Sequence, residues 1–132
     1  MPSYRCDHIH LKAVDVEKTA RWYVDMLGAK ITFEGRFRGS KVYYLDICGF
    51  NFIVFGLLDN EHGESAPIEP TLRTRFGADH FGFAVDNLQE AVADLRTKGV
   101  RILEEPWSPR PGLVICYIEG PDKARIELSE RE

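Results

Sequence analysis

Two short stretches of the chain, DHIHLKA at residues 7–13 and DHFGFAV at residues 79–85, alternate between apolar and other residues. A period of two residues is typical of a β-strand that buries one face. Both stretches are therefore predicted to be strands. Because alternate side chains point to opposite faces of a strand, His8 and His80 are expected on the face opposite the apolar residues.

Each predicted strand is followed by a segment in which apolar residues recur three or four positions apart, as on one face of an amphipathic helix. Asp15 and Asn87 directly precede these segments and are suited to cap a helix N-terminus. Gly28 and Gly99 follow them and are suited to a left-handed C-terminal cap. The apolar positions are Val16, Ala20, Tyr23 and Leu27 in the first segment and Leu88, Ala91, Val92 and Leu95 in the second.

The two halves of the chain repeat one pattern. With an offset of 72 residues, His8 aligns with His80. Three short runs rich in β-forming residues follow each predicted helix, so both halves read β-α-β-β-β. The repeats are expected to span about residues 5–58 and 77–131 of a single domain, residues 1–132, and to be joined by a long polar loop.

Composition and charge exclude several classes of partner. The 132 residues are 44% apolar and 29% charged, as in ordinary globular domains, and the net charge is −4. An acidic chain does not suit a phosphate backbone, so no nucleic acid partner is expected. The longest uncharged apolar run, FIVFGLL, is far shorter than the ~20 residues of a membrane span, and the N-terminus carries no secretion signal. We expect a cytoplasmic protein without a membrane partner.

The cysteines support the same location. Cys6, Cys48 and Cys116 are odd in number and widely spaced. Neither a disulfide framework nor a paired-cysteine metal motif has this pattern. They are expected to be reduced, buried thiols, as is common in cytoplasmic proteins.

Strand alternation also brings chemically active side chains to one face. In ARIELS, Ile126 and Leu128 are expected to face a helix, so Glu127 faces the other way. Together with His8 and His80, it supplies two imidazoles and a carboxylate, a ligand set for a divalent transition metal that leaves positions open for a substrate. The alternative is a metal-free site with two surface histidines and an edge-strand glutamate.

His10 is the histidine without a counterpart, because Gly82 occupies its place in the second repeat. Three interpretations stay open. His10 chelates the same ion as His8, or it carries protons beside the metal, since histidine titrates near neutral pH, or it is a solvated surface side chain.

The stretches DHIHLKAVDVEKTARWYVDMLG, DHFGFAVDNLQEAVADLRTKGV and GPDKARIELSE resemble the vicinal oxygen chelate superfamily, which includes glyoxalase I, methylmalonyl-CoA epimerase, extradiol dioxygenases and fosfomycin-resistance proteins. The resemblance implies an α+β fold in which two βαβββ modules form a curved, partly open mixed sheet with helices on its outer face. It also implies metal ligands at His8, His80 and Glu127, a small-molecule substrate and a homodimer.

One position departs from the family pattern. Aligning RIELS with FIVFG sets Glu127 against Val54, where glyoxalases and the epimerase usually carry Glu or Gln. A valine neither binds metal nor accepts a proton. The three remaining ligands resemble the pattern of the dioxygenases, which use two histidines and one carboxylate.

The leading functional hypothesis is a metal-dependent lyase or isomerase of the glyoxalase or epimerase type. One divalent ion, Fe, Mn, Ni, Co or Zn, would be chelated by a substrate with adjacent oxygens and stabilise an enediolate. His10 and Glu127 are the candidate catalytic residues, and His10 is favoured as the base. The alternatives are an Fe(II) extradiol-type dioxygenase and a non-catalytic binding protein like those that confer bleomycin resistance.

Overall fold

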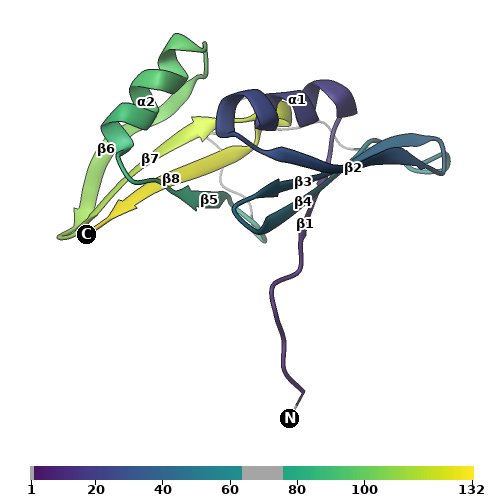
Figure 1. Ribbon diagram of the computed structural model, residues 1–132, viewed down its shortest axis with the longest axis horizontal. Helices are drawn as coiled ribbons and strands as arrows, with labels where there is room; N and C mark the ends of the chain where they lie inside the picture. The colour runs from purple at the N-terminus through teal and green to yellow at the C-terminus, as the bar shows by residue number, and fades with distance from the viewer. Residues whose placement is uncertain (1, 64–75) are drawn as a thin grey trace. The chain divides into compact units, whose positions relative to one another are not determined.

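The computed structural model describes residues 2–63 and 76–132 (Figure 1). The chain forms two compact units, residues 1–64 and 65–132. Each unit contains one of the predicted repeats. The central part of the predicted joining loop, residues 64–75, lies outside the described residues. That the repeats make up a single domain stays a prediction.

The first unit consists of one helix and one four-stranded sheet. The strand order is β1-β4-β3-β2, with β1 parallel to β4 and the other neighbours antiparallel. The elements are β1 (Ile9–Lys12), α1 (Val16–Leu27), β2 (Lys30–Phe37), β3 (Ser40–Ile47) and β4 (Phe50–Phe55).

The second unit repeats this topology. Its strand order is β5-β8-β7-β6, with β5 parallel to β8. A single 3-10 turn, Pro121–Lys123, precedes the last strand. The elements are β5 (Phe81–Ala84), α2 (Leu88–Thr97), β6 (Ile102–Arg110), β7 (Leu113–Glu119) and β8 (Arg125–Arg131). The predicted α+β fold of two βαβββ modules, each with a mixed and open sheet, is confirmed.

The helix ends follow the predicted caps. The Asp15 carboxylate accepts a hydrogen bond from the backbone N–H of Lys18 at 3.0 Å, and Asn87 does the same for Glu90 at 3.0 Å. Gly28 ends α1 in the left-handed conformation, with φ 73°. In the second repeat α2 ends at Thr97, and Lys98, not the glycine, is the C-terminal cap. Gly99 follows the cap in the left-handed conformation, with φ 80°. These local signals define where each helix begins and ends.

Each helix, α1 or α2, lies over one face of its own sheet (Figure 1), and the buried side chains of each unit lie between the two. Burying each large apolar side chain contributes roughly 1.5–3 kcal/mol to stability. The opposite face of each sheet carries polar and aromatic side chains, such as His10 and Tyr44 in the first unit and Glu127 and Tyr117 in the second. Among the most deeply buried side chains are Tyr23, Leu45, Phe52 and Val54 in the first unit and Leu88, Ile118, Ile126 and Leu128 in the second.

The prediction of three buried thiols is wrong for two of them. All three cysteines are free, but only Cys116 is buried. Cys6 lies in the extended segment before β1, and Cys48 lies in the turn between β3 and β4 with φ 48°. Neither position is covered by a helix, so both side chains stay exposed.

Over the described residues, no helix is long and apolar enough to cross a membrane.

Candidate functional site

Two of the three predicted metal ligands converge within the second unit. His80 directly precedes β5 and Glu127 lies on β8, the strand paired with β5. The Nε2 atom of His80 lies 3.9 Å from Oε1 of Glu127. Their side chains are 30% and 23% exposed, so both groups are accessible from solvent.

The other ring nitrogen of His80 is held by the preceding residue. Nδ1 of His80 lies 2.8 Å from Oδ2 of Asp79. This hydrogen bond lowers the pKa of Asp79, with the nearby Arg125 charge also contributing. An ionised carboxylate only accepts hydrogen bonds, so the proton of the neutral ring is on Nδ1. Nε2, the atom facing Glu127, then has a lone pair, as in the carboxylate–histidine pairs that support metal ions.

A glycine makes room for the Glu127 side chain. Gly82 of β5 is paired with Glu127 of β8. A Cβ atom at position 82 would lie 3.0 Å from the Glu127 carbonyl oxygen, 3.2 Å from its Cβ and 3.5 Å from Oε2. Contacts of 3.0 and 3.2 Å are tighter than ordinary van der Waals contacts. A larger residue at position 82 would therefore press on the Glu127 main chain and Cβ, from which the carboxylate extends.

Tyr117 of β7 contacts both candidate ligands. Its hydroxyl donates a hydrogen bond to Oε1 of Glu127 at 3.2 Å, and its ring packs edge-on against the His80 ring with centroids 5.1 Å apart. Burial raises the pKa of Tyr117, and the Glu127 charge adds to this effect. The phenol therefore stays protonated and remains a donor.

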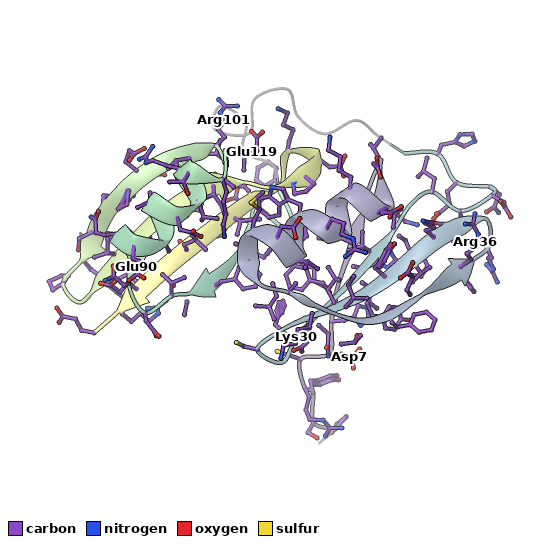
Figure 2. All side chains as sticks on the ribbon, turned by 45° about the horizontal axis from the view of Figure 1, so that its top comes forward. Asp7, Lys30, Arg36, Glu90, Arg101 and Glu119 are labelled. Atoms are coloured by element: carbon purple, nitrogen blue, oxygen red, sulfur yellow. The ribbon has the colours of Figure 1, made fainter. Side chains whose placement is uncertain are left out.

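The first unit carries a more exposed version of the same arrangement. Nδ1 of His8 lies 2.6 Å from Oδ2 of Asp7, and the equivalent distance between His80 and Asp79 is 2.8 Å. The side chains of His8 and Asp7 are 41% and 90% exposed, and Figure 2 shows Asp7 where the N-terminal segment meets the first sheet. Beside them is a pocket of about 190 Å³. It is lined by Asp7, His8, Thr32, Tyr44, Leu45, Asn51, Phe52 and Ile53.

The predicted alignment of Val54 with Glu127 is wrong by one residue. The β1–β4 pairing sets His10 beside Ile53, and the β5–β8 pairing sets Gly82 beside Glu127. Because His10 and Gly82 correspond, the counterpart of Glu127 is Ile53. Val54 is 0% exposed and belongs to the core next to α1. Isoleucine also lacks a metal-binding atom. The first repeat therefore has no ligand at the position corresponding to Glu127, as predicted, but the residue at that position is Ile53.

His10 lies on β1 with an exposed side chain, and its ring packs against Phe55 with centroids 4.6 Å apart. Partial burial and the neighbouring Lys12 charge lower the pKa of His10. Lys12 itself is paired with Glu61, with Nζ 2.6 Å from Oε1. A neutral imidazole at this place has a free lone pair and is able to accept a proton.

The donors in the second unit fit a divalent cation. Imidazole nitrogen and carboxylate oxygen each bind such ions at about 2.1 Å, so two of them on one ion are roughly 3 Å apart. The observed 3.9 Å between His80 and Glu127 is close to this separation. Within residues 2–63 and 76–132, no three His, Cys, Asp or Glu side chains are grouped so as to hold a metal. His8, the third predicted ligand, belongs to the other unit.

Sequence reasoning assigned no role to Asp79 or Arg125. Nη1 of Arg125 lies 3.4 Å from Oδ2 of Asp79, and its guanidinium carbon lies 4.2 Å from the centre of the Tyr117 ring. For Asp79 a signal exists, because an Asp precedes the repeated histidine in both halves. For Arg125 the only sequence signal is its place two residues before Glu127, on the same face of the strand.

Relatives of known sequence cover most of the chain. A probable chloroplastic lactoylglutathione lyase of Arabidopsis thaliana is 29% identical over 129 residues, covering 94% of this chain but only 35% of the relative's length. The uncharacterized protein YwkD of Bacillus subtilis (strain 168) is 29% identical over 127 residues, covering 94% of each chain. The lactoylglutathione lyase of Escherichia coli O157:H7 is 28% identical over 135 residues, covering 95% of this chain and 91% of the relative.

Solved structures share the fold. SMU.1112c superposes with a TM-score of 0.79 at 22% identity, covering 97% of this chain and 100% of the other. A mutant of the fosfomycin resistance protein FosX from Listeria monocytogenes, complexed with Mn(II) and 1S,2S-dihydroxypropylphosphonic acid, gives a TM-score of 0.75 at 19% identity, covering 100% and 95%. Residues 5–128 match one sequence family, and the chain therefore belongs to the Glyoxalase/Bleomycin resistance protein/Dioxygenase superfamily.

Proposed function

We propose that this protein is a metal-dependent lyase or isomerase that binds one divalent cation through His8, His80 and Glu127. The observation that carries the proposal is the approach of His80 Nε2 to Glu127 Oε1 at 3.9 Å, with Asp79 behind the histidine. Members of the superfamily bind small molecules. The relatives described as lactoylglutathione lyases and the Mn(II) complex of FosX support a metal-dependent reaction.

A divalent cation at this place supplies Lewis-acid stabilisation of negative charge on two adjacent substrate oxygens. Asp79 keeps the lone pair of His80 on Nε2, and Tyr117 orients the Glu127 carboxylate by its hydrogen bond. Gly82 leaves space beside the Glu127 main chain and Cβ. These three residues hold the donors in place before a cation arrives, which reduces the ordering cost of binding.

His10 is proposed as the proton acceptor. Its imidazole is exposed on β1, two residues from His8, and is held against Phe55. Removal of a proton from a carbon next to a carbonyl needs such a base within hydrogen-bond reach of the substrate. Glu127 is the second candidate, but its Oε1 already accepts from Tyr117. His10 can act without disturbing the proposed ligands.

The test begins with metal content. Protein purified without chelators is expected to contain about one divalent ion per site and to lose it in His80→Ala. Turnover of lactoylglutathione, assayed with Mn, Fe, Co, Ni and Zn in turn, tests the lyase activity suggested by the relatives. An unmodified protein that binds none of these ions would refute the proposal.

A second candidate, an Fe(II) extradiol-type dioxygenase, is favoured by one observation. In the first repeat Ile53 occupies the place that corresponds to Glu127, so the proposed set is two histidines and one carboxylate, the set typical of such oxygenases. Oxygen uptake with a panel of catechols and anaerobically loaded Fe(II) distinguishes the two reactions. Uptake without lyase activity supports the dioxygenase, and metal-free ligand binding would support a bleomycin-resistance-like protein.

Self-association is part of the proposal. His8 and the pair His80–Glu127 belong to different units of the chain, so the third ligand comes either from the same chain or from a second copy. A homodimer would allow the second arrangement. Mixing a His8→Ala variant with a Glu127→Ala variant tests it, because only sites shared between two chains regain metal in the mixed dimer.

A further inference from the structure

We infer that Arg125 is a positioning residue that holds both His80 and Glu127 in the arrangement that binds a metal. The inference rests on the proposed metal site. Arg125 touches neither candidate ligand through an ion pair of its own. It acts on each of them through an intermediate side chain, Asp79 on one side and Tyr117 on the other.

The first route passes through Asp79. Its Oδ2 atom is shared between two donors, Nδ1 of His80 at 2.8 Å and Nη1 of Arg125 at 3.4 Å. A carboxylate held by a guanidinium has fewer rotamers available than a free one. Arg125 therefore fixes the Asp79 oxygen that orients the His80 ring and keeps its proton on Nδ1.

The second route passes through Tyr117. The guanidinium carbon of Arg125 lies 4.2 Å from the Tyr117 ring centroid, within the range of a cation–π contact. The same side chain packs edge-on against His80 and donates its hydroxyl hydrogen bond to Glu127. Arg125 thus stabilises the orientation of Tyr117, an aromatic side chain that contacts both candidate ligands.

The burial of Arg125 agrees with such a role. Its side chain is only 22% exposed, and among the described residues its Nε atom is buried without a hydrogen-bond partner. A buried donor without a partner costs about 1–3 kcal/mol. The position of Arg125 therefore costs stability. It is better explained by the contacts with Asp79 and Tyr117, which orient the two candidate ligands, than by a contribution of Arg125 to folding.

The first repeat provides an internal comparison. The strand pairings place Asn51 at the position that corresponds to Arg125. Asn51 donates to the backbone carbonyl of Asp7 at 3.2 Å, not to its carboxylate. The Asp7 side chain is 90% exposed, whereas that of Asp79 is 35% exposed. The carboxylate–histidine pair is therefore reinforced by a cation in the second repeat, where Glu127 is also present.

Charge alone and positioning predict opposite effects on metal binding. A guanidinium near a divalent cation repels it, so removing Arg125 would tighten metal binding if only charge mattered. If Arg125 positions the ligands, its removal weakens binding by about 10- to 100-fold, the usual effect of losing a group that orients metal ligands. The sign of the change therefore separates the two roles.

The experiment compares wild-type protein with Arg125→Met, Arg125→Lys and the control Arg96→Met. Arg96 is also an arginine paired with a carboxylate, Glu105, but it lies on α2, which packs on the other face of the sheet. Two readouts are used. Nitrogen NMR of the metal-free protein reports which ring nitrogen of His80 carries the proton, and Mn(II) titration followed by electron paramagnetic resonance gives the affinity.

Wild-type and Arg96→Met proteins are expected to keep the His80 proton on Nδ1 and to bind Mn(II) equally well. Arg125→Met is expected to shift His80 toward a mixture of tautomers and to bind Mn(II) at least tenfold more weakly. Arg125→Lys keeps the charge but not the planar contact with Tyr117. Its Mn(II) affinity should therefore lie between those of the wild-type and Arg125→Met proteins. Unfolding midpoints confirm that each variant folds. If Arg125→Met does not fold, the comparison is made with Arg125→Lys in its place.

Unchanged His80 tautomers in the Arg125 variants, or unchanged or tighter Mn(II) binding, would overturn the inference. If wild-type protein itself binds no Mn(II), the proposed metal site fails on that result. The tautomer comparison in the metal-free protein then still decides whether Arg125 orients His80, so the two failures are distinguishable.

Discussion

Nε2 of His80 and Oε1 of Glu127 lie 3.9 Å apart; His80 directly precedes β5 and Glu127 lies on β8, two strands that are distant in sequence but parallel and adjacent in the second sheet. This pair is the centre of the candidate site. Its supports are on the same sheet: Asp79 holds the far side of the imidazole, and Tyr117 holds the carboxylate.

His80→Ala and Glu127→Ala are each expected to reduce divalent-metal affinity by more than about 100-fold, since losing even a residue that merely orients a ligand costs about 10- to 100-fold. Inductively coupled plasma analysis of protein purified without chelators measures the metal content. His62→Ala is a suitable control, because His62 lies outside the helices and strands, in the segment after β4. Full metal content in either ligand variant contradicts the proposed site.

His10→Ala separates metal binding from catalysis. We expect it to keep its metal and to lose about 100- to 10,000-fold in turnover, the usual contribution of a general base. Metal content and steady-state rates are measured on the same samples. Loss of the metal would instead make His10 a ligand together with His8, and unchanged turnover with metal present would make it an ordinary surface side chain.

Ile53→Glu and Val54→Glu test the strand register. A carboxylate at position 53 faces away from the helix, corresponds to Glu127 and is expected to tighten metal binding while the fold is kept. A carboxylate at position 54, where the side chain is 0% exposed, is expected to cost about 3 kcal/mol or more of folding free energy. Urea unfolding and metal titration give both quantities. The reverse order of stabilities would show that the register is wrong.

Gly82→Ala is expected to displace the Glu127 side chain, because the new Cβ would lie 3.0 Å from the Glu127 carbonyl oxygen and 3.2 Å from its Cβ. Metal affinity should fall by about tenfold, comparable to losing a group that orients a ligand. Ala84→Ser, at the next residue on the same face of β5, is the matched control. Equal affinities in the two variants would show that Glu127 needs no space at position 82.

The three thiols are expected to differ in reactivity. Burial raises the pKa of Cys116 to about 11, so at pH 8 only about one thiol in a thousand is a thiolate, while Cys6 and Cys48 are exposed. Alkylation of native protein at pH 8, followed by mass spectrometry, should modify Cys6 and Cys48 and spare Cys116. Labelling in denaturant is the control and should reach all three. Rapid native labelling of Cys116 would mean that this strand opens readily.

The elements of this fold are predictable because they depend on neighbouring residues. The alternation in residues 7–13 and 79–85, the Asp15 and Asn87 caps and the glycines after the helices are all local signals, and the structure confirms them. The repeat is equally visible, because both copies keep an Asp–His pair before the first strand. The same pattern led to His80 and Glu127, which the structure brings together.

The sequence by itself determined the two βαβββ repeats, their helix ends and the side chains available for chemistry, because periodicity and capping act over a few residues. Only the tertiary structure decided that Ile53, and not Val54, corresponds to Glu127, since register arises from pairing between distant strands and a shift of one residue reverses the face. The contacts of Arg125 with Asp79 and Tyr117 likewise arise from three separate segments that meet only in the folded sheet.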